Sequence, residues 1–349
     1  MAIWLFRAGS NGEYEKRFLE DGKIYLTWDK LNLDLSKVKN KEELKKYLVE
    51  YYDMSKKGRI RNWASQIWPM AHRIKEGDWV ILPSKLKRAI HIGEVLSAYR
   101  HESSGDPLFQ HQRDVRWFAT DIPRSRFDQD LLHSLGAFMT VCRITRNKAE
   151  ERIKNMAENN WQVTHRHLNV AEKGTNQDAE IGDTDELPSD LEIDAKDQIA
   201  KYLQQRFRGH QLTRLINAIL KAKGYVTYQA PEGPDKGVDI LAAPEPMGFG
   251  SPKICVQVKS GDDPVDRATL DQLIGVMHNF KAEHGLFVSW GGYKSSVDRE
   301  IPSQFFNVRL WGQDEIISEL FQNYQHLDNA VQADIPLKQA WVLNWDEVE

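Results

Sequence analysis

Residues 253–260 read KICVQVKS, and their apolar and polar side chains alternate with period two. This alternation predicts a β-strand, because successive side chains of a strand point to opposite faces of the sheet. One face would carry Ile254, Val256 and Val258, and the other Cys255, Gln257 and Lys259. Gln257 and Lys259 are therefore expected to point in the same direction.

The apolar segment before this strand, GVDIL (residues 237–241), predicts a second strand that contains Asp239. A carboxylate in so short an apolar strand is costly to bury unless it is paired or holds a metal. A hairpin of the two strands would bring Asp239, Gln257 and Lys259 together. Carboxylate and amide oxygens suit Mg²⁺, which can activate water for phosphodiester hydrolysis, and a lysine can orient that water.

The segments around this hairpin predict an α/β fold with a central mixed sheet flanked by helices. Residues 211–225 (QLTRLINAILKAKGY) have helical apolar spacing and end on Gly224. Residues 268–282 predict a second helix that buries Leu270, Leu273, Ile274 and Met277, and the apolar strand GLFVSW follows it.

Residues 209–293 resemble the catalytic domain of the Mrr-type restriction endonucleases, in the PD-(D/E)xK nuclease superfamily. The resemblance rests on GHQLTRLINAILKAKGY, PEGPDKGVDILA, SPKICVQVKSGDDPVD, LDQLIGVM and GLFVSWGGY, in that order. It implies that Asp239 and Gln257 are metal ligands for Mg²⁺, with Mn²⁺ as the alternative, and that Lys259 is the catalytic lysine. The Mrr-like group carries Gln where other members have an acid, as VQVK does here.

One feature of the superfamily is missing from this chain. Many members add a Glu on the first helix, and the comparable place here reads GHQLTR, with Gln211 as the nearest candidate. Asp235, with Glu232 in the same PEGPDKG loop, is a substitute, although a loop acid before Gly is more often a turn residue. Gln272, on the helix after the catalytic strand, is a further accessory candidate.

The N-terminal part predicts a compact, barrel-like sheet. IWLF, KIYLTW, DWVILP, AIHIGEVLSAY and VRWFA have strand-like composition, whereas KEELKKYLVEYY and NWASQIWPMAHRI have helical spacing. Seven of the eleven Trp residues lie in the first 161 residues, and most are expected to be core packing. Polar or basic residues flank Trp28, Trp63 and Trp68, which makes these three the candidates for base contact.

This part resembles the PUA-like superfamily, particularly its EVE and YTH relatives, which accommodate modified bases in aromatic pockets. The carrying stretches are FRAGSNGEYEKRFLEDGKIYLTWD, GRIRNWASQIW, KEGDWVILPSKLKRAIHIGEV and DIPRSRFDQDLLHSLGAFMTVCRI. The resemblance implies that Trp28, Trp63 and Trp68 contact a base. Two basic runs are the candidates for phosphate contact: Lys56, Lys57, Arg59 and Arg61, and Lys85, Lys87 and Arg88.

Composition divides the chain into three parts: a reading domain at residues 1–165, an acidic flexible linker at 166–190, and a nuclease domain at 191–349. The net charge of −4 argues little against DNA binding, because residues 170–197 carry ten acids against two lysines and leave +4 on the rest. The two cysteines, Cys142 and Cys255, lie in apolar runs and predict buried thiols. No signal peptide or membrane span is evident, so a cytoplasmic location is expected.

The function expected from the sequence is a Mg²⁺-dependent endonuclease that restricts foreign double-stranded DNA carrying modified bases. Because two-strand cleavage usually requires two active sites, a homodimer is expected as well. Two alternatives stay open: a non-catalytic reader of modified RNA or DNA, and a structure-specific repair nuclease.

Overall fold

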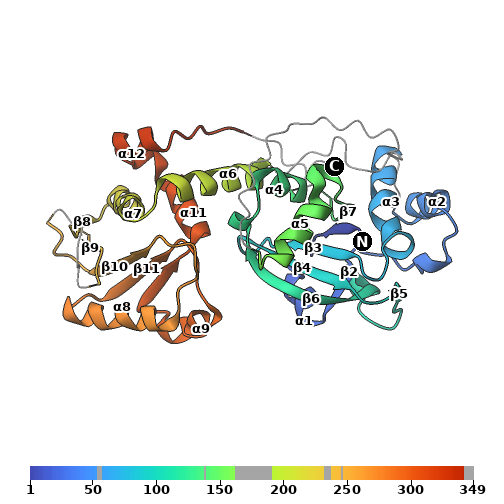
Figure 1. The fold of residues 1–349 in the computed structure, drawn as a ribbon, viewed down its shortest axis with the longest axis horizontal. Helices are drawn as coiled ribbons and strands as arrows, with labels where there is room; N and C mark the ends of the chain where they lie inside the picture. Colours follow the sequence, from blue (N-terminus) through green and yellow to red (C-terminus); the bar gives the residue numbers. More distant parts are fainter. Residues whose placement is uncertain (53–56, 137–138, 162–190, 232–236, 245–246, 342–349) are drawn as a thin grey trace. The chain divides into compact units, whose positions relative to one another are not determined.

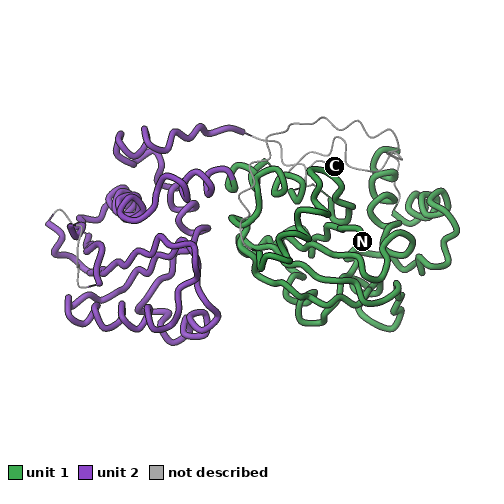
Figure 2. The backbone as a smooth tube through the Cα atoms, in the orientation of Figure 1, with its two compact units in different colours: residues 1–197, 344–349 green, residues 198–343 purple. Residues whose placement is uncertain are grey.

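The computed structural model describes residues 1–52, 57–136, 139–161, 191–231, 237–244 and 247–341. The predicted linker at 166–190 lies outside these residues, as do Lys56, Glu232 and Asp235. The chain divides into two compact units, residues 1–197 (unit 1) and residues 198–343 (unit 2) (Figure 2). Helix α6 (Leu191–Arg206) crosses this division. Its first residues therefore belong to unit 1, whereas the sequence assigned them to the nuclease domain.

Unit 1 is built on a seven-stranded sheet of order β2-β6-β4-β3-β1-β7, with β5 paired to β6 (Figure 1). The pairs are antiparallel except β1 with β3. The long strand β6 pairs with β2 and β5 in its first half and with β4 in its second. The strands are β1 (Ile3–Phe6), β2 (Lys23–Leu26), β3 (Trp79–Pro83), β4 (Ala89–Val95), β5 (Arg100–His101), β6 (His111–Pro123) and β7 (Val141–Arg143).

The sheet of unit 1 curls but is not closed among the described strands. The register of β4 against β6 shifts at Ile92 and Gly93, and a Cβ on Gly93 would lie 2.4 Å from Val115 Cγ1. Glycine thus permits the close approach of the two strands at this irregularity. No described pairing joins β2 to β7, so the PUA-like barrel is not confirmed.

Helices cover both faces of this sheet, which explains why β1 is buried along its whole length. Trp4 and Phe6 pack in one core cluster, with α1 to α3, while Ile3 and Leu5 pack in another, with α4 and α5. The two helices that the sequence predicted here, α2 and α3, are thus accompanied by α1, α4 and α5. The helices are α1 (Glu15–Glu20), α2 (Lys41–Tyr52), α3 (Lys57–His72), α4 (Gln129–Leu135) and α5 (Ala149–Glu158), with 3₁₀ turns at Leu35–Lys37, Pro107–Phe109, Arg124–Arg126 and Arg146–Lys148.

Unit 2 contains the predicted mixed sheet, of order β12-β11-β10-β9-β8. Strands β8, β9 and β10 form an antiparallel meander, and β10, β11 and β12 are parallel. Parallel strands need crossover connections, and α8 supplies one between β10 and β11. The strands are β8 (Val226–Gln229), β9 (Ile240–Ala243), β10 (Ile254–Lys259), β11 (His284–Ser289) and β12 (Val308–Trp311).

The helices of unit 2 form two layers over this sheet (Figure 1). One core cluster joins α6, α7, α11 and α12 to one face, and a second cluster joins α8 and α9 to the other. The helices are α7 (His210–Ala222), α8 (Arg267–Asn279), α9 (Ser295–Asp298), α10 (Ile301–Gln304), α11 (Gln313–Asn323) and α12 (Asn329–Asp334), with a 3₁₀ turn at Tyr324–His326.

Local signals explain where the two helices around the hairpin begin and end. The apolar residues predicted for α7 are all buried, and Gly224 follows the helix with a φ of +91°. Asp266 caps α8 by accepting a hydrogen bond from Thr269 N–H. In α8 Leu270, Leu273 and Met277 are buried, whereas Ile274 is half-buried.

Both cysteines are buried and free, as predicted. Burial raises the pKa of the Cys255 thiol to about 11, so the thiol stays protonated at neutral pH. None of the helices within the described residues has the length and apolar character needed to cross a membrane.

Candidate active site and binding pocket

The β9–β10 hairpin places Asp239 beside Gln257. Asp239 lies one residue before β9 rather than inside the strand, but its N–H donates to Val256 O at 2.9 Å. Continuing the register that pairs Val256 with Ile240 sets Asp239 opposite Gln257. The carboxylate of Asp239 accepts a hydrogen bond from Val258 N–H at 2.7 Å. The local fold thus holds one carboxylate against the strand that carries the QxK sequence.

Gln257 and Lys259 lie on the face of the sheet that α8 covers. Cys255 packs in the cluster with α8, while Val256 packs in the cluster with α7, which confirms the predicted alternation along β10. Gln257 and Lys259 follow Cys255 at period two, so they project from the same face. Gln257 is 4% exposed and Lys259 is half-buried.

A buried amide oxygen identifies where a cation would fit. Gln257 Oε1 has no hydrogen-bond partner among the described residues. A buried oxygen without a partner is costly, and in native structures it calls for an explanation such as an ion. Mg²⁺ takes oxygen ligands and keeps several waters, so one carboxylate and one amide oxygen are compatible with it. In the described parts of the chain no three His, Cys, Asp or Glu residues gather to hold a metal, so backbone or water oxygens would complete the shell.

The backbone at Gly237 passes close to α8, beside the side chain of Gln257. Gly237 has a φ of +85°, and a Cβ there would lie 3.2 Å from Val276 Cγ2 and 4.0 Å from Gln257 Nε2. A side chain at residue 237 would both strain the backbone and crowd α8. Glycine therefore lets the segment that leads to Asp239 approach Gln257.

The accessory candidates lie differently. Gln211 is exposed on α7, where its Oε1 accepts a hydrogen bond from Arg214 at 3.0 Å. Helix α7 packs on the opposite face of the sheet from Gln257, but it begins beside the end of β10, where Gly209 N–H donates to Ser260 Oγ at 2.8 Å, so Gln211 stays an accessory candidate. Gln272 lies on α8, over the correct face, but its side chain is exposed.

Replacing Gln257 by Leu separates metal binding from folding. Removing a buried oxygen that lacks a partner should leave the metal-free Tm unchanged or higher, because nothing in the fold needs that atom. The rise in Tm that Mg²⁺ or Mn²⁺ causes in the wild type should disappear. Thermal unfolding with and without metal measures both, and Gln322→Leu, on the exposed surface of α11, is the matched control. A metal-induced rise that survives in Gln257→Leu would exclude Gln257 as a ligand.

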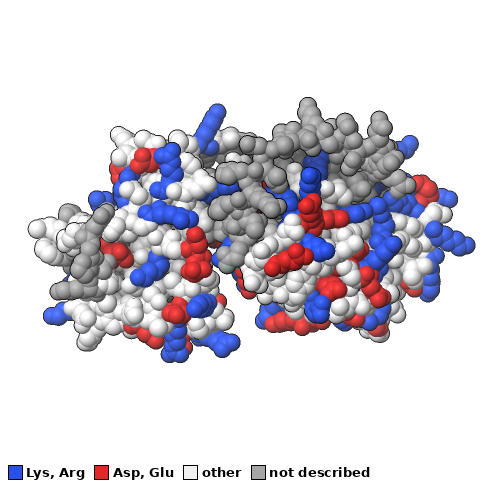
Figure 3. Space-filling view, viewed as in Figure 1, with Lys and Arg blue, Asp and Glu red and all other residues white. Residues whose placement is uncertain are grey.

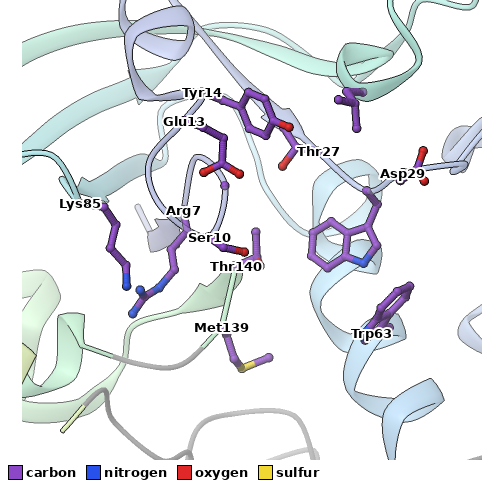
Figure 4. A pocket seen from close by; sticks show the side chains of 13 residues that line it. Arg7, Ser10, Glu13, Tyr14, Thr27, Asp29, Trp63, Lys85, Met139 and Thr140 are labelled. Carbon is purple, nitrogen blue, oxygen red and sulfur yellow. The ribbon is translucent and has the colours of Figure 1, made fainter. Parts of the chain in front are cut away.

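Unit 1 contains a cavity of about 360 Å³ with one aromatic side. Trp28 and Trp63 line it, and their ring centroids lie 6.1 Å apart with the planes at 77°. Both are half-buried against the core, so each ring has a fixed position and a free surface. Figure 4 shows Trp63 on one side of the cavity, and Glu13, Ser10 and Thr140 on the other.

The third tryptophan candidate has another role in the structure. Trp68 stacks on His72 with the ring centroids 3.7 Å apart, and it does not line the cavity. It lies on α3, as Trp63 does, but five residues further along the helix. Five residues correspond to about 500° of helical rotation, which turns the two rings to different faces. We therefore do not retain Trp68 as a base contact.

The basic candidates divide into exposed and buried residues. Lys57, Arg59 and Arg61 are exposed in the first turns of α3, and the Arg59 guanidinium lies 5.2 Å from the Trp63 ring centroid. In Figure 3, Lys and Arg side chains gather over the end of unit 1 that carries α2 and α3. Lys85 lines the cavity, and Lys87 pairs with Asp121 at 2.5 Å.

Arg88 differs from its expected role. Its side chain is 12% exposed and is paired with the buried Asp197. A guanidinium held in this way is committed to the fold, so we remove Arg88 from the phosphate-binding set. The basic run KLKR gives no local sign of this pairing, because Asp197 lies far away in the sequence.

The two units match different family models. The segment that contains Asp239, Gln257 and Lys259 matches the model Mrr_cat, described as a restriction endonuclease. Residues 204–320 match the restriction endonuclease family. Residues 4–145 match a domain of unknown function, DUF8426, so the PUA-like assignment has no support from this comparison. No curated protein matches the chain.

Two solved structures are distantly similar to the chain. One is the DNA modification-dependent restriction endonuclease AspBHI, with 14% identity over 74% of this chain and 68% of that chain, and a TM-score of 0.32. The other is the MspJI restriction endonuclease in complex with a 27-mer oligonucleotide, with 13% identity over 81% of this chain and 70% of that chain, and a TM-score of 0.30. Likenesses as low as these carry no argument about this protein.

The polar residues that line the cavity in unit 1, apart from Lys85, were not predicted from the sequence. Arg7 and Glu13 line it from the loop between β1 and α1, Thr140 lines it from the residue before β7, and no short motif links the three. The turn-forming run GSNGE, residues 9–13, was the one local signal. Such a run predicts a turn without saying what the turn faces.

A buried hydrogen-bond network around Glu15 fixes the loop of Lys85, which is one of the residues that line the cavity. Glu15 Oε1 accepts a hydrogen bond from Ser84 Oγ at 2.8 Å and lies 3.2 Å from His91 Nε2, while Oε2 accepts from Lys85 N–H at 3.3 Å. Burial alone raises the pKa of Glu15. The hydrogen bonds with His91, Ser84 and Lys85 outweigh this effect and hold the pKa below its ordinary value.

Acid should therefore weaken unit 1 through Glu15. A carboxylate with a lowered pKa in the folded state contributes stability that is complete above its unfolded pKa and is lost as the pH falls through the folded value. Below about pH 4.5, the free energy of unfolding of the wild type should fall more steeply than that of Glu15→Gln. Denaturant unfolding from neutral pH downward measures the two slopes. Parallel slopes would show that Glu15 does not titrate with unfolding.

Proposed function

We propose that this protein is a metal-dependent endonuclease that cleaves DNA carrying modified bases, with unit 1 as the reader and unit 2 as the nuclease. The observation that carries the nuclease half is the buried, unpartnered Gln257 Oε1 opposite the Asp239 carboxylate. Both residues lie in the segment that matches the restriction endonuclease family.

In the proposed mechanism, Asp239 and Gln257 hold Mg²⁺, or Mn²⁺ as the alternative. When bound, the ion supplies Lewis-acid stabilisation of phosphate charge and lowers the pKa of a water. Val258 N–H fixes the Asp239 carboxylate through its 2.7 Å hydrogen bond, so the carboxylate is oriented before DNA arrives. Lys259, on the same face, places its ammonium group toward the scissile phosphate, where it orients the attacking water and offsets negative charge.

In the proposed reader, the cavity of unit 1 receives a base turned out of the helix. Turning out a base costs a few kcal/mol, and stacking returns about 1–3 kcal/mol for each aromatic contact. Trp28 and Trp63 together would offset that cost. Arg59 lies beside Trp63, and Lys57 and Arg61 are exposed in the same part of α3, where the three would hold phosphates near the extruded base.

A second candidate function is a non-catalytic reader of modified nucleic acid. It is favoured by the lack of any cluster of three His, Cys, Asp or Glu among the described residues. Against it, the β9–β10 hairpin retains the carboxylate of Asp239, the amide of Gln257 and the lysine Lys259. A structure-specific repair nuclease is less favoured, because recognition of a DNA junction needs no base pocket. Cleavage of both strands by the preferred function would use two copies of the active site.

Plasmid cleavage in Mg²⁺ tests the proposal. Plasmids with different base modifications are incubated with the wild type, with Lys259→Ala, and with Lys253→Ala, an exposed lysine at the other end of the same strand. We expect cleavage of at least one modified plasmid by the wild type and by Lys253→Ala, and none by Lys259→Ala. Equal cleavage of every plasmid would remove the reader half of the proposal. Binding without any cleavage would establish the non-catalytic reader.

A further inference from the structure

Glu13 holds a fixed carboxylate on the polar side of the cavity in unit 1. Its Oε2 accepts a hydrogen bond from Asn11 N–H at 2.8 Å. A Cβ on Gly9 would lie 2.3 Å from Glu13 Cδ, and Gly9 has a φ of +89°. The turn at residues 9–13 thus uses a glycine to make room for the carboxylate. A group held in place by its own turn is oriented before a ligand binds.

The surroundings of Glu13 define which ligand edge fits. Figure 4 shows Arg7 and Lys85 on the same side of the cavity as Glu13, and Trp63 across from them. A flat ring that stacks on the indole side therefore directs an edge toward a carboxylate acceptor with cationic N–H donors near it. Asp29 also lines the cavity, but on the side of Trp63, and neither Asn nor Gln lines it within the described residues.

We propose that Glu13 makes this pocket selective for bases that present an exocyclic amino group, and against thymine-type and uracil-type bases. This proposal rests on the proposed function of unit 1 as a base reader. It assigns to Glu13 the choice of base, while the two tryptophans supply stacking that every base accepts.

The hydrogen-bonding groups of the Glu13 carboxylate and of the base explain the selectivity. A carboxylate only accepts hydrogen bonds, and Glu and Asp pair with the amino group of cytosine for this reason. In the pose that turns the amino group of cytosine toward Glu13, thymine places a carbonyl oxygen at the same position, so an oxygen faces the carboxylate. Two acceptors facing each other leave both without a hydrogen bond and reject the ligand.

Binding to single strands made of thymine with one central test base measures this preference. The flanks carry no amino group, so the central base alone presents one. The pairs are 5-methylcytosine against thymine, and 5-hydroxymethylcytosine against 5-hydroxymethyluracil, which share the 5-substituent and exchange the amino group for a carbonyl. Strands with central N6-methyladenine or guanine show whether a purine supplies the amino group. The protein is the full chain with Lys259→Ala, so that no strand is cut.

The Glu13→Gln variant provides the decisive comparison. The protein with Glu13 should favour the amino member of each pair by about 10–100-fold. In Glu13→Gln the new carbonyl can still accept from Asn11 N–H, and its amide NH₂ then faces the cavity as a donor. The preference should fall to parity or reverse. Glu20→Gln, on the exposed surface of α1, should keep the preference of the parent.

The outcomes separate this inference from the function on which it rests. An equal loss of affinity for both members of each pair in Glu13→Gln would mean that Glu13 only supports the loop, and would overturn the inference. A parent that favours the thymine-type member would overturn it as well. If no strand is preferred and Trp63→Ala changes nothing, the base-reader function itself fails, and the selectivity of Glu13 fails with it.

Discussion

Asp239→Asn should lose DNA cleavage by about a thousandfold while the protein stays folded and still binds DNA. The variant removes the one carboxylate that the hairpin sets opposite Gln257, and with it the charge that would hold the cation. A thousandfold loss corresponds to about 4 kcal/mol of transition-state stabilisation, in the range that a metal supplies. Asparagine keeps a carbonyl oxygen for the hydrogen bond from Val258 N–H, so the fold should be little affected.

Single-turnover cleavage and equilibrium DNA binding measure the two halves of this prediction. Asp271→Asn is the matched control, because Asp271 is an exposed acid on α8 that pairs with Arg267 at 3.6 Å. It should cleave at the wild-type rate. Cleavage by Asp239→Asn within tenfold of the wild type would place the essential carboxylate elsewhere in the chain.

Asp197→Ala should destabilise unit 1 more than any other single change proposed for this protein, by about 3–5 kcal/mol. The Asp197 side chain is completely buried, and two arginines converge on it. Arg124 Nε donates to its carboxylate at 3.0 Å, and the Arg124 and Arg88 side chains are 5% and 12% exposed. Removing the carboxylate deprives the buried Arg124 guanidinium of the group to which its Nε and Nη2 donate, and the penalty of an uncompensated buried charge is large.

Denaturant unfolding measures this effect. Lys196→Ala is the control on the same helix, because Lys196 forms an exposed pair with Glu192, and such pairs contribute about 0.3–0.5 kcal/mol. A change of less than about 1 kcal/mol in Asp197→Ala would show that the buried cluster contributes little to the stability of unit 1.

The sequence predicted features whose signal is local and periodic. The alternation of KICVQVKS assigned its residues to the correct faces, and the apolar spacing of α7 and α8 predicted both helices. The order of these elements, with Asp239 before a strand that ends in Lys259, was enough to predict the mixed sheet of unit 2. Burial on one side of an element imposes a repeat of 2 or 3.6 residues, so a single sequence records it.

Contacts between distant parts of the chain were decided by the tertiary structure alone. Arg88 pairs with Asp197, which lies 109 residues away in the sequence. Glu13 and the two tryptophans line the same cavity, although they come from separate segments of the chain. The backbone hydrogen bond from Asp239 N–H to Val256 O holds Asp239 beside β10, just before β9 begins. A local sequence pattern records which side of an element is buried, but not which distant residue covers it. For that reason the sequence by itself determined the elements, their faces and the candidate Asp-Gln-Lys set, while packing decided which arginine was committed to the fold and that Glu13 faces the pocket.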